Sequence, residues 1–186
     1  MRPVSSRRVP SDTPDAAGLI VALLVRYPEL ATIVSHPSDG TLTLSFAIRA
    51  ALDRDAARGA RDAVAEHVRS LLEFRREAAD VLQVGTESDR AMSFVRLVRD
   101  ARTFGREELE LLVALLAQHF GERVVKSPPP ENEAGEEEAS DDLVEYALDA
   151  LRDPQSKRSL VGFREEKRVL VYFVPSPKKA KARARN

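Results

Sequence analysis

Seven residues of this sequence belong to the types that most often act in catalysis or hold a metal ion. They are His36, His67, His119, Asp53, Asp55, Glu107 and Glu108. The three histidines do not have the spacing at which one helix presents two metal ligands on the same face. The carboxylates stand as two pairs at the starts of expected helices, where acidic side chains cap free amide groups and favour the positive end of the helix dipole. We therefore expect structural roles for all seven and predict no catalytic residue, no metal site and no cofactor.

The turn at residues 36–40 is where we would look first for an enzyme site, because turns often carry functional side chains. Its titratable residues are His36 and Asp39. The Pro, Ser, Asp and Gly residues that follow His36 nevertheless explain the segment as an ordinary turn between two strands. His67 falls on the apolar stripe of one expected helix and His119 in the last turn of another, where structural roles are usual. No phosphate-binding glycine loop and no Gly-x-Ser-x-Gly motif occurs, so the sequence favours a protein that is not an enzyme.

The nearly neutral total charge hides three segments of very different charge. The chain has 29 basic and 30 acidic side chains in 186 residues. Residues 1–130 hold 18 of each sign, residues 131–153 hold ten acids and one arginine, and residues 154–186 hold ten bases and two acids. Such asymmetry is typical of segments that bind a partner or bind each other.

The basic C-terminal segment carries the sharpest functional signal in the sequence. Its positive side chains are Lys178, Lys179, Lys181, Arg183 and Arg185. Ser176-Pro177 and the two lysines that follow resemble the Ser-Pro-Lys-Lys elements of histone tails, which lie along the DNA minor groove; the resemblance covers about ten residues and occurs once. Five such side chains would displace about five counterions from a phosphate backbone, which gives salt-sensitive binding of nucleic acid. The alternatives are a solubilising end, or a tail that folds back onto the acidic segment 131–142.

The pattern of apolar residues predicts an α+β core and a smaller C-terminal unit. Helices are expected over 14–26, 53–77, 103–121 (beginning within Thr103–Arg106) and 141–152, and strands over 30–35, 41–48, 81–86, 92–99, 122–126, 160–163 and 169–174. From Thr41 onward this order is that of the ferredoxin-like (split βαβ) arrangement, β-α-β-β-α-β, in an antiparallel or mixed sheet. A helix and a strand precede it, and a helix with a β-hairpin follows it.

Five regions describe the expected organisation of the chain. They are a flexible tail (1–12), the α+β core (13–126), an acidic Pro/Glu-rich linker (127–140), a helix and hairpin docked on the core (141–174) and a basic disordered tail (175–186). We expect the hairpin to dock because its second strand is apolar on both faces and an isolated hairpin is only marginally stable. Ser45-Phe46 and Ser93-Phe94, 48 residues apart, also raise the possibility of an internal duplication.

RNA-recognition modules share the ferredoxin-like order and stack bases on exposed aromatic residues of their central strands. In this sequence the predicted central strands offer Phe46 and Phe94, and both fall in the apolar register. We therefore expect both rings in the core, and the fold alone does not predict RNA binding.

Composition sets the remaining expectations. The chain has no cysteine, which excludes disulfides and thiolate metal sites. The longest apolar run, Leu19–Val25, is seven residues long, against the ~20 that a membrane-spanning helix needs. Acidic residues and prolines interrupt the pattern of a secretory signal, and the abundance of Ala and Arg suggests a bacterial GC-rich genome. We expect a cytoplasmic, bacterial interaction or regulatory module that binds a protein partner or itself through an exposed strand edge or the acidic segment, with a nucleic-acid- or ribosome-associated protein as the alternative.

Overall fold

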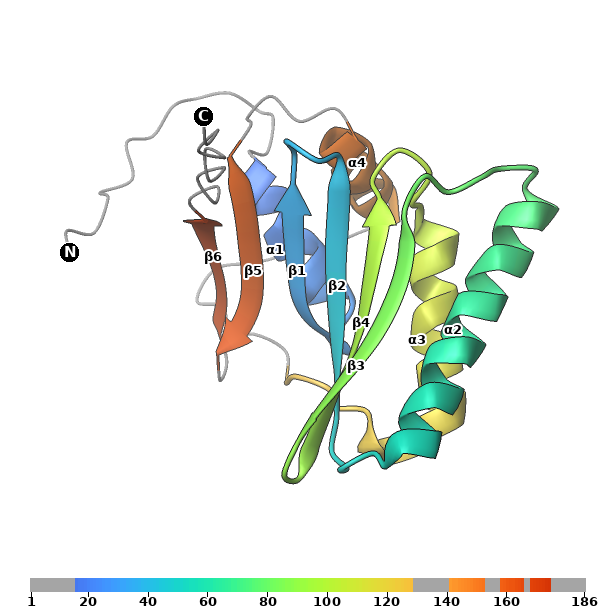
Figure 1. The fold of residues 1–186 in the computed structure, drawn as a ribbon. Helices are drawn as coiled ribbons and strands as arrows, with labels where there is room; N and C mark the ends of the chain where they lie inside the picture. Colours follow the sequence, from blue (N-terminus) through green and yellow to red (C-terminus); the bar gives the residue numbers. More distant parts are fainter. Residues whose placement is uncertain (1–15, 129–140, 153–157, 166–167, 175–186) are drawn as a thin grey trace, which may run out of the picture.

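The prediction of an α+β fold is confirmed by a computed structural model, which describes residues 16–128, 141–152, 158–165 and 168–174 (Figure 1). The helices are α1 (Ala16–Arg26), α2 (Arg54–Phe74), α3 (Arg106–Phe120) and α4 (Asp141–Arg152), with a short 3-10 helix, η1 (Gly121–Arg123), after α3. The strands are β1 (Leu30–His36), β2 (Thr41–Ile48), β3 (Leu82–Asp89), β4 (Met92–Asp100), β5 (Ser159–Glu165) and β6 (Arg168–Val174).

The six strands form one antiparallel sheet with the order β3-β4-β2-β1-β5-β6. Each of the three hairpins, β1–β2, β3–β4 and β5–β6, stays paired within itself. The second hairpin joins the first through β4 and β2, and the third joins it on the other side through β5 and β1. The C-terminal hairpin is therefore part of the main sheet, and β3 and β6 are the two edge strands.

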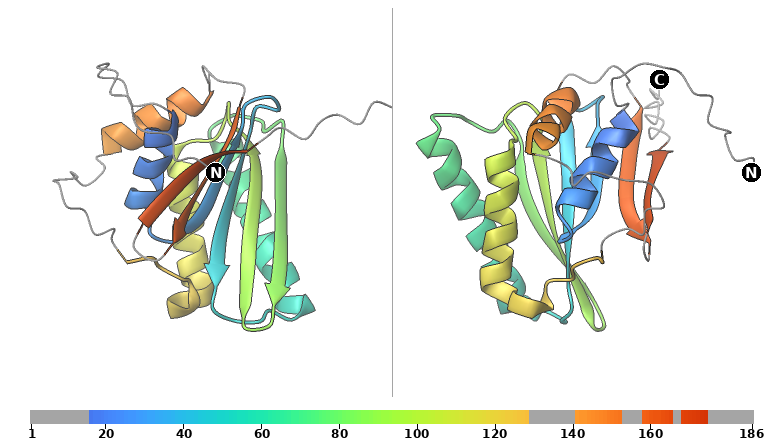
Figure 2. Two further views of the ribbon diagram at one scale, coloured as in Figure 1. Left: turned by 90° about the vertical axis from the view of Figure 1, so that its left-hand side faces the viewer. Right: turned by 180° about the vertical axis from the view of Figure 1, so that it is seen from behind.

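The four helices cover one face of this sheet (Figures 1 and 2). Along β2, the residues that face the helices are fully buried, and they alternate with polar or small residues on the other face. The core-facing set is Leu42, Leu44, Phe46 and Ile48. Helix α1 contacts α4 as well as β5 and β6, which is why its apolar residues are buried on more than one side, as its sequence predicted.

The segment expected as a strand over 122–126 differs from the prediction. It forms η1 and then a single bridge between Val124 and Ile48, with backbone hydrogen bonds from Arg49 N to Arg123 O (2.7 Å) and from Val125 N to Ala47 O (2.8 Å). The reason is that β1 already pairs with β2 from Leu30 to His36, so only the last residues of β2 remain free on that side. The described chain thus shows the β-α-β-β-α part of the expected order and reduces its last strand to one bridge.

The face assignment of β4 is a second correction. Ser93, Val95, Leu97 and Arg99 face the helices and are buried, whereas Phe94 lies on the opposite face and is only half-buried. The prediction that Phe94 belongs to the core is therefore wrong, while the same prediction for Phe46 is confirmed. Sequence alternation was misleading here because two polar residues, Ser93 and Arg99, occupy core-facing positions of β4.

Close packing of α1 on the C-terminal hairpin depends on a glycine in β5. Gly162 is buried, and a methyl group added to its Cα would overlap Ile20 Cγ2 and lie 3.0 Å from Leu24 Cδ1. Gly85 in the edge strand β3 is the opposite case, because a methyl group there would meet nothing within 4 Å. The hairpin can approach α1 only because residue 162 lacks a side chain.

We predict that Gly162→Ala lowers the free energy of unfolding by about 1–3 kcal/mol, the usual cost of overfilling a packed interior. The matched variant Gly85→Ala should change it by less than ~0.5 kcal/mol, as is usual for exposed positions. Urea denaturation followed by circular dichroism measures both. Equal stabilities for the two variants would show that the hairpin does not pack on α1 in solution.

Candidate functional site

The structure does not bring the three histidines together. His36 ends β1, and its Nδ1 lies 3.4 Å from Ser159 Oγ, whereas the Asp39 carboxylate in the same turn accepts a hydrogen bond from Ser38 Oγ. His67 is exposed on α2, with its Nδ1 2.7 Å from the Ala63 carbonyl of its own helix, and His119 is exposed at the end of α3. Within the described residues, no group of three or more His, Asp or Glu side chains has the geometry of a metal site.

The first carboxylate pair has the structural role expected for it. Asp53 is the N-cap of α2, and its Oδ1 accepts a hydrogen bond from Ala56 N at 2.8 Å. Asp55 in the first turn forms an ion pair with Arg58 at 2.9 Å, with both side chains largely exposed. These contacts stabilise the start of α2. The two carboxylates do not point toward one position where they could bind a ligand together.

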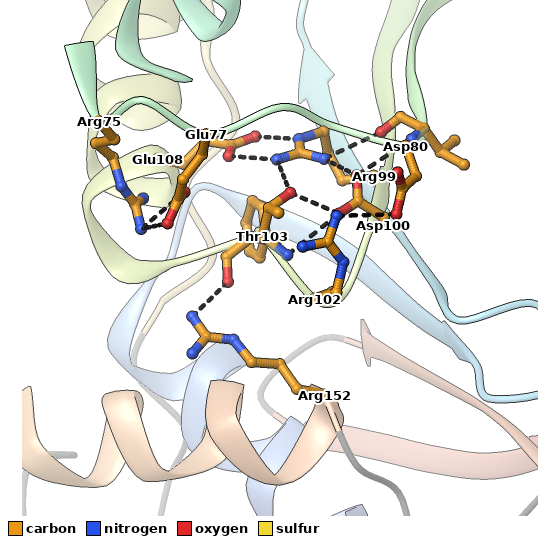
Figure 3. Close-up of polar contacts among 11 residues, drawn as sticks. Arg75, Glu77, Asp80, Arg99, Asp100, Arg102, Thr103, Glu108 and Arg152 are labelled. Carbon is orange, nitrogen blue, oxygen red and sulfur yellow. Dashed lines mark hydrogen bonds and ion pairs between the residues drawn. The ribbon is translucent and has the colours of Figure 1, made fainter. Parts of the chain in front are cut away.

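The second carboxylate pair, Glu107 and Glu108, includes a buried ion pair that the sequence did not predict. Glu107 is exposed, but Glu108 is fully buried and binds the fully buried Arg99 of β4 through two parallel hydrogen bonds (Figure 3). Arg99 Nε lies 2.7 Å from Glu108 Oε1, and Arg99 Nη2 lies 3.0 Å from Oε2. This bidentate geometry is the strongest arrangement available to an arginine and a carboxylate.

The rest of the Arg99 guanidinium is satisfied by the loop that leads into α3. Nη1 donates to the Val81 carbonyl at 3.0 Å and to the Asp100 carboxylate, and Nη2 donates to Thr103 Oγ1 at 3.0 Å. Asp100 in turn accepts from Thr103 N (3.1 Å), from Thr103 Oγ1 (2.5 Å) and from Val81 N (3.1 Å). The cluster therefore ties β4, the approach to β3 and the start of α3 into one hydrogen-bonded unit.

The two carboxylates of this cluster are shifted in opposite directions. Burial would raise the pKa of Asp100, but hydrogen bonds from Thr103 and Val81, with the Arg99 charge, outweigh burial and lower the pKa. For Glu108, burial raises the pKa, and the bonds and charge of Arg99 oppose that rise only in part. Because each group is saturated by partners inside the protein, the cluster has no free donor or acceptor directed at solvent, and its geometry fits a structural anchor.

A hollow of about 580 Å³ lies beside this anchor, between the ends of α2, α3 and α4. Two arginines reach into it: Arg75 forms an ion pair with Glu77 at 3.2 Å, and Arg152 donates to Phe104 O at 2.9 Å and to Asp149 Oδ1 at 2.7 Å (Figure 3). The third arginine of the lining, Arg106, forms an ion pair with Glu145 at 3.3 Å, so each arginine of the lining has an acidic partner there. The hollow is therefore charge-compensated and does not single out a ligand.

The edge strand β6 has the most apolar exposed surface of the described chain. Tyr172, Phe173 and Val174 are 53%, 59% and 36% exposed. Tyr172 stacks on Phe163 of β5 with ring centroids 5.9 Å apart, and Arg158 lies over the Phe173 ring at 5.6 Å. Within the described residues no strand pairs with the outer edge of β6, and because side chains alternate along a strand, Phe173 flanks this edge on one face of the sheet and Tyr172 and Val174 flank it on the other.

The opposite edge strand, β3, is polar and lies beside α2. Its side chains on the open face of the sheet are Gln83, Glu87 and Asp89, with Gly85 between them, and Glu87 pairs with Arg96 at 3.1 Å. Charged residues of this kind on an edge strand disfavour pairing with a further apolar strand. The two edges of the sheet thus have contrasting chemistry, and we take the β6 edge as the candidate functional site.

The basic residues singled out in the sequence, Lys178, Lys179, Lys181, Arg183 and Arg185, lie outside the described residues. The same holds for residues 1–15 and 129–140, which include the expected N-terminal tail and most of the acidic linker. The segment 13–126 expected as the core is described from Ala16 onward.

A scan against protein-family models finds no match for this chain, and neither a search of curated proteins nor a search of solved structures finds a similar protein. None of the described helices is long and apolar enough to cross a membrane.

We predict that Arg99→Met lowers the free energy of unfolding by about 3–5 kcal/mol, because it leaves two buried carboxylates without their cation. Arg102→Met is the matched control: Arg102 forms a 3.0 Å ion pair with Asp80, but both side chains are about two-thirds exposed. Its loss should have little effect on the free energy of unfolding, because exposed ion pairs contribute little. Denaturant unfolding of the two variants tests the anchor, and a small effect at Arg99 would contradict it.

Proposed function

We propose that this protein is a non-catalytic interaction module that self-associates through the outer edge of β6. The observation that supports the proposal is the exposure of three consecutive apolar residues, Tyr172–Val174, on a strand whose outer edge has no described partner. Unpaired strand edges readily accept another strand, and a strand added here would cover apolar side chains on both faces of the sheet edge. Because the edge residues come from one short strand, a second strand of matching length is the simplest partner.

The sequence of β6 is compatible with antiparallel pairing to its own copy. With Val171 on the two-fold axis, Leu170 would face Tyr172, Val169 would face Phe173, and Arg168 would face Val174. Pairs between aromatic and aliphatic residues stabilise neighbouring strands, and like charges would not meet because Arg168 is the only charged residue of the strand. A two-fold contact of this kind is self-complementary and closes at the dimer.

The open face of the sheet gives less support to the alternative of RNA binding. We infer a ferredoxin-like relationship for Thr41–Phe120, the order that RNA-recognition modules share, and Phe94 does lie on the face that such modules use. Arg96, its basic neighbour on that face, is engaged by Glu87, and β3 adds Asp89 to the same face. A phosphate backbone would meet carboxylates there, so the sheet favours a protein partner.

We predict that the protein exists in a concentration-dependent equilibrium between monomer and dimer, measured by light scattering after size exclusion or by analytical ultracentrifugation. Phe173→Lys and, separately, Tyr172→Lys should weaken the dimer by about tenfold or more, since each removes an apolar anchor and places two like charges at the contact.

Phe74→Lys is the matched control, because Phe74 is 86% exposed at the end of α2 and does not belong to the β6 edge. It should leave the equilibrium unchanged, and circular dichroism should show that all three variants are folded. A wild-type protein that stays monomeric up to its solubility limit, or a control with the same effect as Phe173→Lys, would contradict the proposal.

A further inference from the structure

A groove runs between α2 and the outer edge of β3, at the end of the sheet opposite to β6. It consists of two adjoining hollows of about 380 and 470 Å³, which share Arg69 and Leu82 in their linings. Helix α2 packs over the β3 end of the sheet, on the face that all four described helices cover, so Leu82 and Val84 of β3 face it (Figures 1 and 2). A strand added to the free edge of β3 would therefore place every second side chain on the face that α2 covers.

The α2 side of the groove is acidic. Its carboxylates, Asp62, Glu66, Glu73 and Glu77, recur at spacings of four, seven and four residues, with Glu77 just after the helix end, and they outnumber the two arginines of the lining, Arg61 and Arg69. Asp62 pairs with Arg61, and Glu77 pairs with Arg75. Within the described residues, Glu66, Glu73 and Arg69, which lies between them on the helix, form no ion pair, so two unpaired carboxylates against one unpaired guanidinium leave the groove with net negative charge.

The β3 side of the groove offers apolar contacts and a free backbone edge. Leu82 and Val84 are half-buried, point toward α2 and pack on the core together with Ala79. The described residues place no strand on the outer edge of β3, whose amide and carbonyl groups can pair with an extended chain. A matching segment would be extended, would alternate basic with small residues and would place its bases toward α2.

We infer that this groove binds residues 179–185 of another copy of the chain. In this segment Lys179, Lys181, Arg183 and Arg185 alternate with alanines, so an extended conformation puts all four bases on one face and three methyl groups on the other. Pro177, which cannot donate a backbone hydrogen bond, precedes the segment and does not interrupt it. Charge and periodicity both match the groove.

The reach of the chain explains why the segment must come from another copy. Residue 174 ends β6, which lies five strand positions from β3, or about 24 Å at the usual spacing of about 4.8 Å. The five residue steps from residue 174 to residue 179 span about 18 Å at most when fully extended. The contact is consequently head-to-tail, it uses the sheet edge opposite to β6, and it does not depend on the β6 dimer proposed above.

The test is direct binding of a fluorescently labelled synthetic peptide of residues 175–186 to the full-length protein, followed by anisotropy. We expect saturable binding that weakens as salt rises. The receptor variant Glu66→Lys/Glu73→Lys should bind the peptide at least about tenfold more weakly, and the milder Glu66→Gln/Glu73→Gln should show a smaller loss. The control Glu107→Lys/Glu122→Lys, which changes charge equally at exposed sites outside the groove, should bind as the wild type does.

Two further arms separate this proposal from others. A peptide of the same composition with its bases consecutive should bind more weakly, because it loses the alternation; equal binding of the two peptides, or of the groove and control variants, would overturn the proposal. The variant Phe173→Lys should still bind the peptide even if it no longer forms the β6 dimer. The two proposals can therefore fail independently of each other. If the peptide does not bind the protein, but the full chain binds a generic DNA duplex in a gel-shift assay and needs residues 175–186 to do so, the tail binds nucleic acid and the proposal is wrong.

Discussion

The arrangement of the whole sheet depends on one constraint: β1 pairs with another strand along each of its two edges. Thr32–Ser35 pair with Leu42–Ser45 of β2 on one side and with Leu160–Phe163 of β5 on the other. Because β1 occupies the flank of β2, the segment after α3 can add only a single bridge at Val124. Because β1 also accepts β5, the C-terminal hairpin extends the sheet and β6 becomes its edge. Both the departure from the ferredoxin-like order and the position of the candidate functional site follow from this strand.

The buried Arg99–Glu108 pair shows why part of the structure could not be predicted from the sequence. Arginine and glutamate near a helix start are ordinarily solvated, and local patterns assign Glu108 to the helix dipole. Burying both is tolerated only because the guanidinium and the carboxylate satisfy each other, and Asp100 and Thr103 satisfy what remains. That saturation requires β4, the loop and α3 to be in place together, which no local pattern records.

Element positions were predictable where backbone preferences are strong, and faces were not predictable where the core contains polar residues. The bounds of β2 and α4 match the prediction, since a clean two-residue alternation defines one and an amphipathic helical pattern defines the other. In β4, buried Ser93 accepts from Leu52 N and donates to Ala50 O, so a core position is polar and Phe94 falls on the other face. Phe46 and Phe94 therefore lie on opposite faces of the sheet, and the 48-residue spacing of the two Ser-Phe pairs does not mark equivalent positions of a duplication.

The contrast between the two sheet edges is what connects the fold to association. An apolar edge such as β6 gains most from pairing with a strand like itself, because desolvation of aliphatic and aromatic side chains is its main driving force. The β3 edge, flanked by the α2 carboxylates, disfavours an apolar strand, since that strand would leave charged groups desolvated and unpaired. It is complementary instead to an extended chain that carries positive charge. The two proposed contacts would then lie five strand positions apart on one sheet and would differ in the chemistry of the strand that each accepts.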